Sequence, residues 1–272
     1  MVHPTIEPHN EKPAATWNSA GDAYDEISRG IADSIEHAIL RLSPQPGERI
    51  LDLATGTGWT SRQLALRGAR VTGVDLGADL VAAARARARA ARLEIDYVVG
   101  DAERLQLEDA SFDAVISTYG VMFASRPEAA AAEVARVCKK GGRLALTTWT
   151  PDGNVFGMFK VMKPYMPAPP SPAPPSPFEW GRRERIRELF GKSFELAFED
   201  GTSFYREPRA EVAWTRFVTG YGPTKMLANG LSPDRRAGLE RDFIAFHARP
   251  EFATELGICV PREYLLTIGV RT

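Results

Sequence analysis

The segment RILDLATGTGWTS, residues 49–61, restricts the fold more than any other part of the chain. An apolar strand runs into a glycine-bearing turn, and a helical pattern starts directly after it. Glycine lets a ligand approach the backbone where a side chain would block it. The N-terminus of the following helix offers free N–H groups and a positive dipole end, which suit an anionic ligand group. The segment therefore predicts a nucleotide-binding turn at the carboxyl edge of a parallel sheet.

Strands and helices alternate between residues 49 and 149. The apolar runs ILDLA, VTGV, YVV, AVIS and LALTTW are nearly continuous, as in parallel strands that are buried on both faces. Strands are expected at 49–54, 70–75, 94–99, 112–118 and 143–149. Helices are expected at 60–67, 78–92 and 127–138, with a short turn near Glu103. This alternation predicts a doubly wound α/β sheet with helices on both faces.

The segments on either side of this core show other patterns. Residues 1–16 are polar and are expected to form a mobile terminus. Residues 17–42 are expected to be helical, with isoleucines every fourth residue from Ile27 to Ile39 on one face. Residues 164–177 contain eight prolines in fourteen positions, which fits either a linker or a strap across the active site. The remaining expected elements are helices at 151–166, 182–190, 209–218 and 233–249, and strands at 194–206 and 264–271.

Several polar residues follow the expected strands. Asp75 ends the second strand, nineteen residues after Gly56, where a carboxylate can accept hydrogen bonds from both hydroxyls of an adenosine ribose. Asp101 and Ala102 follow the third strand, in position to contact an adenine amino edge. Taken alone, Asp75 or Asp101 fits equally well as a helix cap or turn residue. Their order along the chain, together with the glycine turn, favours a cofactor site.

These motifs resemble those of the class I S-adenosylmethionine-dependent methyltransferases, in particular the type 11 branch that contains the ubiquinone and menaquinone biosynthesis enzymes. The resemblance covers residues 17–150 well and residues 151–272 loosely. It rests on Asp52-Leu53-Ala54-Thr55-Gly56-Thr57-Gly58, in which Ala54 replaces the first glycine of the family. It implies a Rossmann-like, seven-stranded sheet of order 3-2-1-4-5-7-6 with an antiparallel last strand. The N-terminal signature of the quinone enzymes is echoed only by Ala23-Tyr24-Asp25, so quinone substrates are not transferred.

The resemblance also implies a set of residues that contact S-adenosylmethionine. Asp75 would bind the ribose, Asp101 and Ala102 the adenine, and Ser117 and Thr118 would line the methionine side. Trp17 and Tyr24 are expected either to place aromatic faces near the sulfonium or to pack as a helix–lid contact. The complete expected set is Trp17, Tyr24, Asp52, Ala54, Gly56, Gly58, Asp75, Leu76, Asp101, Ala102, Ser117 and Thr118.

Catalytic side chains are less clearly marked. A general base is needed only if the acceptor arrives protonated. The candidates for such a role are Tyr24 and His247, and the alternative for His247 is a structural, partly exposed histidine. The four histidines and the two cysteines, Cys138 and Cys259, match no metal-ligand spacing, so no metal is expected.

Charge and hydropathy narrow the class of partner. The formal net charge of −1 gives no field that would attract nucleic acid. The first residues lack a basic stretch followed by an apolar one, and no segment has the roughly 20 apolar residues that span a bilayer. The sequence therefore predicts a soluble, cytoplasmic protein that acts on a small molecule, with no nucleic acid partner and no membrane span. Its oligomeric state stays open.

We expect residues 1–272 to form a single methyltransferase domain. Its core would be residues 45–150 plus the strands near 194–206 and 264–271, and its helical cap would come from 17–42, 151–180 and 209–250. The cap segments are rich in aromatic and methionine side chains, including Phe159 and Tyr165, so we expect a small, largely apolar or aromatic acceptor.

Two alternatives compete with the methyltransferase reading. The first is an NAD(P)-dependent Rossmann oxidoreductase, whose fingerprint requires a glycine where this chain has Ser61. The second is a non-catalytic protein of the same fold that only binds an adenosyl ligand.

Overall fold

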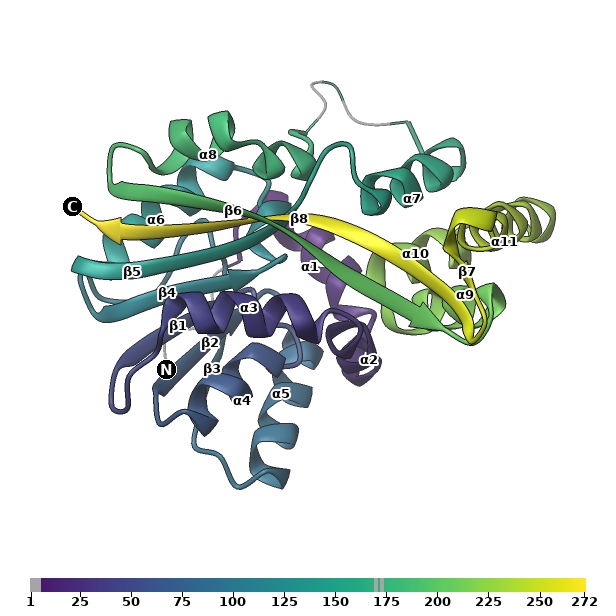
Figure 1. Ribbon diagram of the computed structural model, residues 1–272. Helices are drawn as coiled ribbons and strands as arrows, with labels where there is room; N and C mark the ends of the chain where they lie inside the picture. Colours follow the sequence, from purple (N-terminus) through teal and green to yellow (C-terminus); the bar gives the residue numbers. More distant parts are fainter. Residues whose placement is uncertain (1–5, 169–170, 172–173) are drawn as a thin grey trace.

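The alternating apolar runs of the first half form the parallel part of one sheet (Figure 1). The computed structural model describes residues 6–168, 171 and 174–272. Its first five strands are β1 (Arg49–Leu53), β2 (Arg70–Asp75), β3 (Asp96–Val99), β4 (Phe112–Thr118) and β5 (Cys138–Trp149). They pair in parallel in the order β3-β2-β1-β4-β5, which brings their carboxyl ends to one edge.

Two long strands from the second half complete the sheet. β8 (Gly257–Arg271) lies antiparallel between β5 and β6 (Phe194–Glu207), and the two-residue β7 (Ala253–Thr254) pairs with β8 outside this path. The order β3-β2-β1-β4-β5-β8-β6 confirms the expected sheet, in which the last long strand is antiparallel. Trp149, the last residue of β5, pairs with Tyr264, so the first half of β8 extends with β6 beyond the carboxyl edge (Figure 1).

Helices cover both faces of the sheet (Figure 1). One face carries α3 (Ala32–Leu42), α4 (Trp59–Leu66) and α5 (Ala78–Ala90), and the other carries α6 (Pro127–Val137) and α8 (Arg183–Phe190). On α3, Ile35, Ile39 and Leu42 recur at helical spacing and are almost fully buried. Their burial, with that of the strand residues they contact, forms the main core.

The remaining helices gather beyond the carboxyl ends of the strands (Figure 1). They are α1 (Glu11–Asn18), α2 (Tyr24–Arg29), α7 (Asn154–Met162), α9 (Ala210–Gly220), α10 (Gly222–Asn229) and α11 (Pro233–His247). α10 is not among the helices expected from the sequence. Proline in the first turn of a helix removes an N–H group that has no intrahelical partner anyway, so Pro223 is compatible with the start of α10. Within the described part of the chain, none of the helices has the length and apolar composition that a membrane crossing requires.

Two expectations about the first forty residues are wrong. The described part of the expected mobile terminus is ordered: Pro8–Asn10 form a 3-10 turn, and α1 follows directly. Its order comes from hydrogen bonds to Asp101, a partner so distant in sequence that local composition gives no sign of it. The expected helical stretch 17–42 is divided among α1, α2 and α3, with breaks near Gly21, whose φ is +53°, and Gly30. Residues 1–5 lie outside the described residues.

The proline-rich segment 164–177 is described only in part, since residues 169–170 and 172–173 lie outside the described residues. Its two ends form 3-10 turns, Lys163–Tyr165 and Pro177–Gly181. None of its described residues lines either of the two cavities at the carboxyl edge. The described residues therefore give no support to a strap across the site.

Candidate active site

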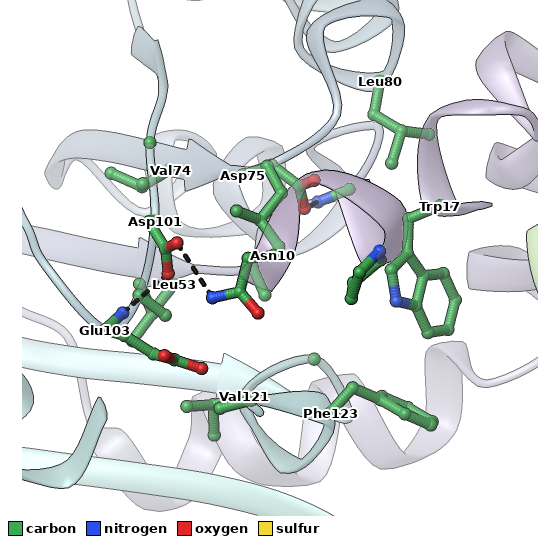
Figure 2. Close-up of a pocket in the computed structure, with 18 of the residues that line it drawn as sticks. Asn10, Trp17, Leu53, Val74, Asp75, Leu80, Asp101, Glu103, Val121 and Phe123 are labelled. Atoms are coloured by element: carbon green, nitrogen blue, oxygen red, sulfur yellow. Dashed lines mark hydrogen bonds between the residues drawn. The ribbon is translucent and has the colours of Figure 1, made fainter. Parts of the chain in front are cut away.

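A cavity lies where the carboxyl ends of β1, β2 and β4 meet α1 and α2 (Figure 2). It encloses about 720 Å³ of empty space, part of which is open to solvent. Of the expected cofactor residues, eight line it: Trp17, Tyr24, Ala54, Gly56, Asp75, Leu76, Asp101 and Ala102. The other four do not line this cavity: Asp52, Gly58, Ser117 and Thr118.

The turn after β1 takes backbone conformations that favour glycine. Gly56 has a φ of +57°, and a Cβ added there would lie 3.0 Å from the ring of Tyr24. Glycine therefore allows Tyr24 of α2 to lie directly over the turn. Gly58 has a φ of +76°, and a Cβ there would lie 2.2 Å from the hydroxyl of Tyr97. Gly58 thus allows close packing of α4 against β3 and does not line the cavity.

Ala54, which stands where the family has its first glycine, is strained. Its φ is +57°, in the left-handed region that costs an L-residue about 1–2 kcal/mol. Its Cβ has room only because residue 120 is glycine, since a Cβ on Gly120 would lie 2.3 Å from that of Ala54. The substitution of the first glycine is therefore accommodated by a second glycine at the end of β4.

The carboxylate of Asp75 is the most exact match to a ribose-binding group. Asp75 ends β2, is 8% exposed, and accepts hydrogen bonds from the backbone N–H groups of Gly56 (2.8 Å) and Gly77 (2.9 Å). Each oxygen accepts only one of these bonds, so both retain acceptor capacity. Burial raises the pKa of Asp75, and no ion pair with a described cation offsets this effect. Hydroxyl donors from a ligand would satisfy this buried carboxylate.

Asp101, the expected adenine contact, is bound by the N-terminal segment (Figure 2). Its Oδ2 accepts hydrogen bonds from the side-chain amide of Asn10 (2.9 Å) and the backbone N–H of Glu7 (3.0 Å), and its Oδ1 accepts one from the N–H of Glu103 (2.9 Å). His9 contacts Glu103 at 2.6 Å, which adds a second link between the same segments. Asp101 therefore anchors the segment that covers this end of the cavity, while Asn10 itself becomes part of the cavity wall.

Three of the expected residues that do not line the cavity, Asp52, Ser117 and Thr118, have side chains with structural partners. Asp52 is 1% exposed and accepts hydrogen bonds of 2.6 Å from the hydroxyls of Thr55 and Ser61, while burial raises its pKa to about 6. The Ser117 hydroxyl donates to the carbonyl of Leu53, and the Thr118 hydroxyl bonds that of Thr60. These side chains hold the strand ends and the turn in place, and none of them lines the first cavity.

Asp25 is a residue of the site whose role the sequence did not reveal. Its carboxylate contacts the hydroxyl of Thr57 at 2.9 Å, Arg62 at 2.9 Å and Arg87 at 3.2 Å. These contacts tie α2 to the glycine turn, to α4 and to α5. They fix the neighbouring Tyr24 over Gly56. The only signal in the sequence was the dipeptide Tyr24-Asp25.

A second cavity of about 440 Å³ of empty space adjoins the first on the side of the cap. The two share Trp17, Tyr24, Tyr119 and Phe123 as lining residues. Trp17 makes edge contacts to Tyr24, Phe123 and Tyr221, with ring centroids 6.2, 4.8 and 5.4 Å apart. The complete lining is Trp17, Tyr24, Ile27, Ile31, Tyr119, Phe123, Trp149, Val155, Met158, Phe217, Tyr221 and Arg262. A ligand in this cavity would meet mainly aromatic and aliphatic side chains.

The structure places the two candidate bases differently. Tyr24 lies between the two cavities, and burial together with the Asp75 carboxylate raises its pKa, so its phenol stays protonated at neutral pH. His247 is 1% exposed in α11, bonds the carbonyl of Phe243 through Nδ1, and lines neither cavity. Burial lowers the pKa of His247 to about 4. In this position His247 is a core residue.

Other aromatic residues of the expected cap lie away from the cavities. Phe159 packs edge-on against Phe178, with centroids 5.1 Å apart, and Tyr165 donates a hydrogen bond to Asp242 at 2.5 Å. Neither Phe159 nor Tyr165 lines either of the two cavities, so these two cavities give no support to a direct contact of Phe159 or Tyr165 with the acceptor. Sequence reasoning also missed Asn10 and Arg262. The signal for Arg262 is its place in the alternation of buried residues Ile258, Val260 and Tyr264, in a part of the last strand that lies before the expected start at Tyr264.

Known proteins resemble this chain in sequence and in fold. Residues 51–146 match the family model described as a methyltransferase domain. An uncharacterized protein of Mycobacterium tuberculosis (strain H37Rv) is 42% identical over 144 residues, which cover 53% of this chain and 52% of that protein. A demethylmenaquinone methyltransferase of Beutenbergia cavernae is 38% identical over 141 residues, which cover 50% of this chain and 57% of that protein. The chain thus spans about half the length of these relatives.

A solved structure shares the fold. It is phosphoethanolamine N-methyltransferase 2 of Haemonchus contortus, in complex with phosphomonomethylethanolamine and S-adenosylhomocysteine. Its TM-score is 0.54 at 20% identity, and the likeness covers 88% of this chain and 52% of that one. The family match covers the glycine turn, Asp75 and Asp101.

Proposed function

We propose that this chain, which carries a class I S-adenosylmethionine-dependent methyltransferase domain, transfers a methyl group to a small, largely apolar or aromatic molecule. The observation that carries the proposal is the pair of adjoining cavities. The first contains a buried carboxylate with free acceptor capacity next to a glycine turn. The second has aromatic walls and shares four residues with the first. We further propose that sheet and helical cap act together as a single domain over residues 1–272.

The residues of the first cavity fit S-adenosylmethionine. We assign Asp75 to the ribose hydroxyls, since its carboxylate is buried without a cation partner among the described residues. Ala102 and Leu76 would flank the adenine, beside the segment that Asn10 anchors to Asp101. Ala54 and Gly56 leave the backbone of the turn open to the ligand. Trp17 and Tyr24 would offer aromatic faces to a sulfonium cation.

The protein would contribute to methyl transfer mainly by positioning the acceptor next to the methyl group of the cofactor. Bound S-adenosylmethionine supplies a methyl group that its sulfonium already activates, and the acceptor's lone pair forms the new bond as the carbon–sulfur bond breaks. Trp17, Tyr24, Tyr119 and Phe123 line both cavities, and with both ligands bound these side chains would exclude water from the space between the ligands. The tyrosines of this wall, with raised pKa values, are poor bases at neutral pH. An acceptor with a free lone pair or a readily ionised group is therefore favoured.

The alternative of a nicotinamide-dependent oxidoreductase loses its support. The position that its fingerprint requires as glycine is Ser61, and the Ser61 hydroxyl donates to Asp52 inside the core. The family model that matches this segment is that of a methyltransferase domain. A non-catalytic adenosyl-binding protein would bind the same cofactor but show no turnover, so a turnover assay separates it from the proposal.

The test is turnover of S-adenosylmethionine with a panel of small phenols, amines and aromatic acids, with methylated products and S-adenosylhomocysteine quantified by mass spectrometry. We expect product with at least one small aromatic acceptor, and much less product from the Asp75→Asn variant. Tight binding of S-adenosylmethionine without turnover of any panel member would favour the binding protein. Efficient methylation of intact DNA, RNA or folded protein, with no small-molecule activity, would contradict the proposed substrate class.

A further inference from the structure

Arg262 lies at the carboxyl edge of the sheet and lines the second cavity. It belongs to the part of β8 that continues beyond β5, since Tyr264 pairs with the last residue of β5 and Arg262 comes two positions earlier in the strand. Arg262 is only 6% exposed. A guanidinium is thus held inside an otherwise apolar and aromatic cavity, next to the walls shared with the proposed cofactor site.

Among the described residues, no carboxylate forms a direct ion pair with this guanidinium. Among the described residues, Arg262 takes part in no ion pair and no side-chain hydrogen bond, and its Nη2 is buried without a partner. The nearby carboxylates are engaged elsewhere: Asp33 with Ser203 and the backbone of Phe204, and Glu207 with Arg216. Leaving a buried charge unpaired is costly in free energy. The structure therefore holds a buried guanidinium that has no ion-pair partner among the described residues.

Two aromatic rings pack against the guanidinium of Arg262. Its guanidinium carbon lies 3.9 Å from the centroid of the Tyr205 ring and 5.5 Å from that of Phe217. Such cation–π contacts offset part of the desolvation of the charge and orient the guanidinium plane. They leave the N–H edge of the fork free, and that edge is the part that binds a carboxylate through two parallel hydrogen bonds.

At neutral pH the side chain of Arg262 is charged, whereas the nearby phenols are neutral. Burial lowers the pKa of Arg262 to about 10, so the guanidinium stays protonated at neutral pH. Burial raises the pKa values of Tyr24, Tyr119 and Tyr221, so these phenols stay neutral. Among the described residues that line the second cavity, Arg262 is the only charged one.

We propose that the methyl acceptor is an aromatic or similarly planar molecule that carries a carboxylate, and that Arg262 binds this carboxylate inside the second cavity. The inference rests on the proposed methyltransferase function. The carboxylate acts as an anchor: the aromatic walls hold the ring, and the end of the acceptor opposite Arg262 points toward Trp17 and Tyr24, between the two cavities. Arg262 is thereby a specificity-determining residue that distinguishes acids from their neutral analogues.

The test compares acids with their primary amides, using matched pairs such as benzoate, hydroxybenzoate and cinnamate. Binding is measured by calorimetry on protein saturated with S-adenosylhomocysteine, for the wild type, Arg262→Met and Arg262→Lys. A charge-assisted bidentate contact predicts that wild type prefers at least one acid over its amide by roughly 10- to 100-fold. Arg262→Met should reduce that preference to about one, and Arg262→Lys should retain part of it.

The matched control is Arg206→Met. Arg206 also lies over an aromatic ring, with its guanidinium carbon 5.1 Å from the centroid of Phe204, but it is exposed and outside the second cavity. Arg206→Met should keep the wild-type acid preference, and all variants should bind S-adenosylhomocysteine within about twofold of wild type. If Arg262→Met does not fold, Arg262→Lys takes its place, and an acid preference equal to that of the wild type in Arg262→Lys would contradict the inference.

Failure of this inference differs from failure of the proposed function. Equal binding of acids and amides to the wild type, or an acid preference that persists in Arg262→Met, would overturn the inference. Turnover of neutral acceptors alone would also overturn it, while the methyltransferase function would stand. Absence of turnover with every panel member, in protein that binds S-adenosylmethionine, would overturn the proposed function and with it the role of Arg262 in acceptor choice.

Discussion

The side-chain amide of Asn10 donates a hydrogen bond of 2.9 Å to the carboxylate of Asp101, across 91 positions of sequence. Asn10 is 3% exposed, and its own carbonyl oxygen accepts a hydrogen bond from the Ser125 hydroxyl. The amide thus joins the N-terminal segment to Asp101, which follows β3, and to Ser125, which follows β4. Because Asn10 also lines the first cavity, this link connects the order of the N-terminus to cofactor binding.

We predict that Asn10→Ala weakens the binding of S-adenosylhomocysteine by about 3- to 30-fold, chiefly by speeding its dissociation. The substitution leaves the buried Asp101 with one fewer donor, a loss on the order of 1–2 kcal/mol, and loosens the cover of the cavity. Stopped-flow displacement measures the dissociation rate. Lys12→Ala, an exposed position on the same segment, is the control. Unchanged affinity and dissociation in Asn10→Ala would show that the segment has no part in retention of the cofactor.

The strain at Ala54 predicts an unusual response to glycine. Ala54→Gly relieves a φ of +57° that costs alanine about 1–2 kcal/mol, against a smaller entropic cost of glycine in the unfolded chain. We expect the free energy of unfolding to stay equal or to rise by about 1 kcal/mol. Ala129→Gly, within α6, should instead lower it by about 1 kcal/mol. Urea denaturation measures both, and a destabilisation of Ala54→Gly similar to that of Ala129→Gly would argue against the strain.

His247 predicts a pH dependence of stability. Its pKa is about 4 in the folded protein and 6.5 in an unperturbed histidine, so the unfolded state binds more protons between these values. The stabilisation due to neutral His247 is complete above pH 6.5 and is lost as the pH falls toward 4, by roughly 2–4 kcal/mol. His247→Leu should flatten this part of the stability profile relative to wild type. Because His247 lines neither cavity, its turnover at neutral pH should remain within about threefold of wild type. A large, pH-dependent loss of turnover would instead support a catalytic base.

The sequence was sufficient to locate the parallel sheet. β2 and β4 have the bounds that their apolar runs predict, because parallel strands buried on both faces need continuous apolar side chains. The carboxyl ends of β1, β2 and β3 place Gly56, Asp75 and Ala102 on the wall of the first cavity, since the carboxyl ends of parallel strands share one edge of the sheet.

The parts that could not be predicted depend on contacts between distant segments. The order of residues 6–16 comes from Asp101 and Glu103, and a polar, proline-bearing segment without these partners is indistinguishable from a mobile one. Ser117 and Thr118 stand at the expected strand end, but their hydroxyls bond the adjacent strand and helix. Arg262 is visible only as a residue that interrupts an apolar pattern until the cap is folded around it.

The central claim is that Asp75 binds the ribose of an adenosyl cofactor in the first cavity, and calorimetric titration with S-adenosylhomocysteine tests it most directly. Wild type should bind, and Asp75→Asn should bind about 10- to 100-fold more weakly because it loses charge-assisted hydrogen bonds of roughly 1.5–3 kcal/mol. Asp96→Asn, which removes an equal charge at the exposed start of β3, should bind like wild type. Absence of measurable wild-type binding to both S-adenosylmethionine and S-adenosylhomocysteine, or equal affinity in Asp75→Asn, would contradict the account.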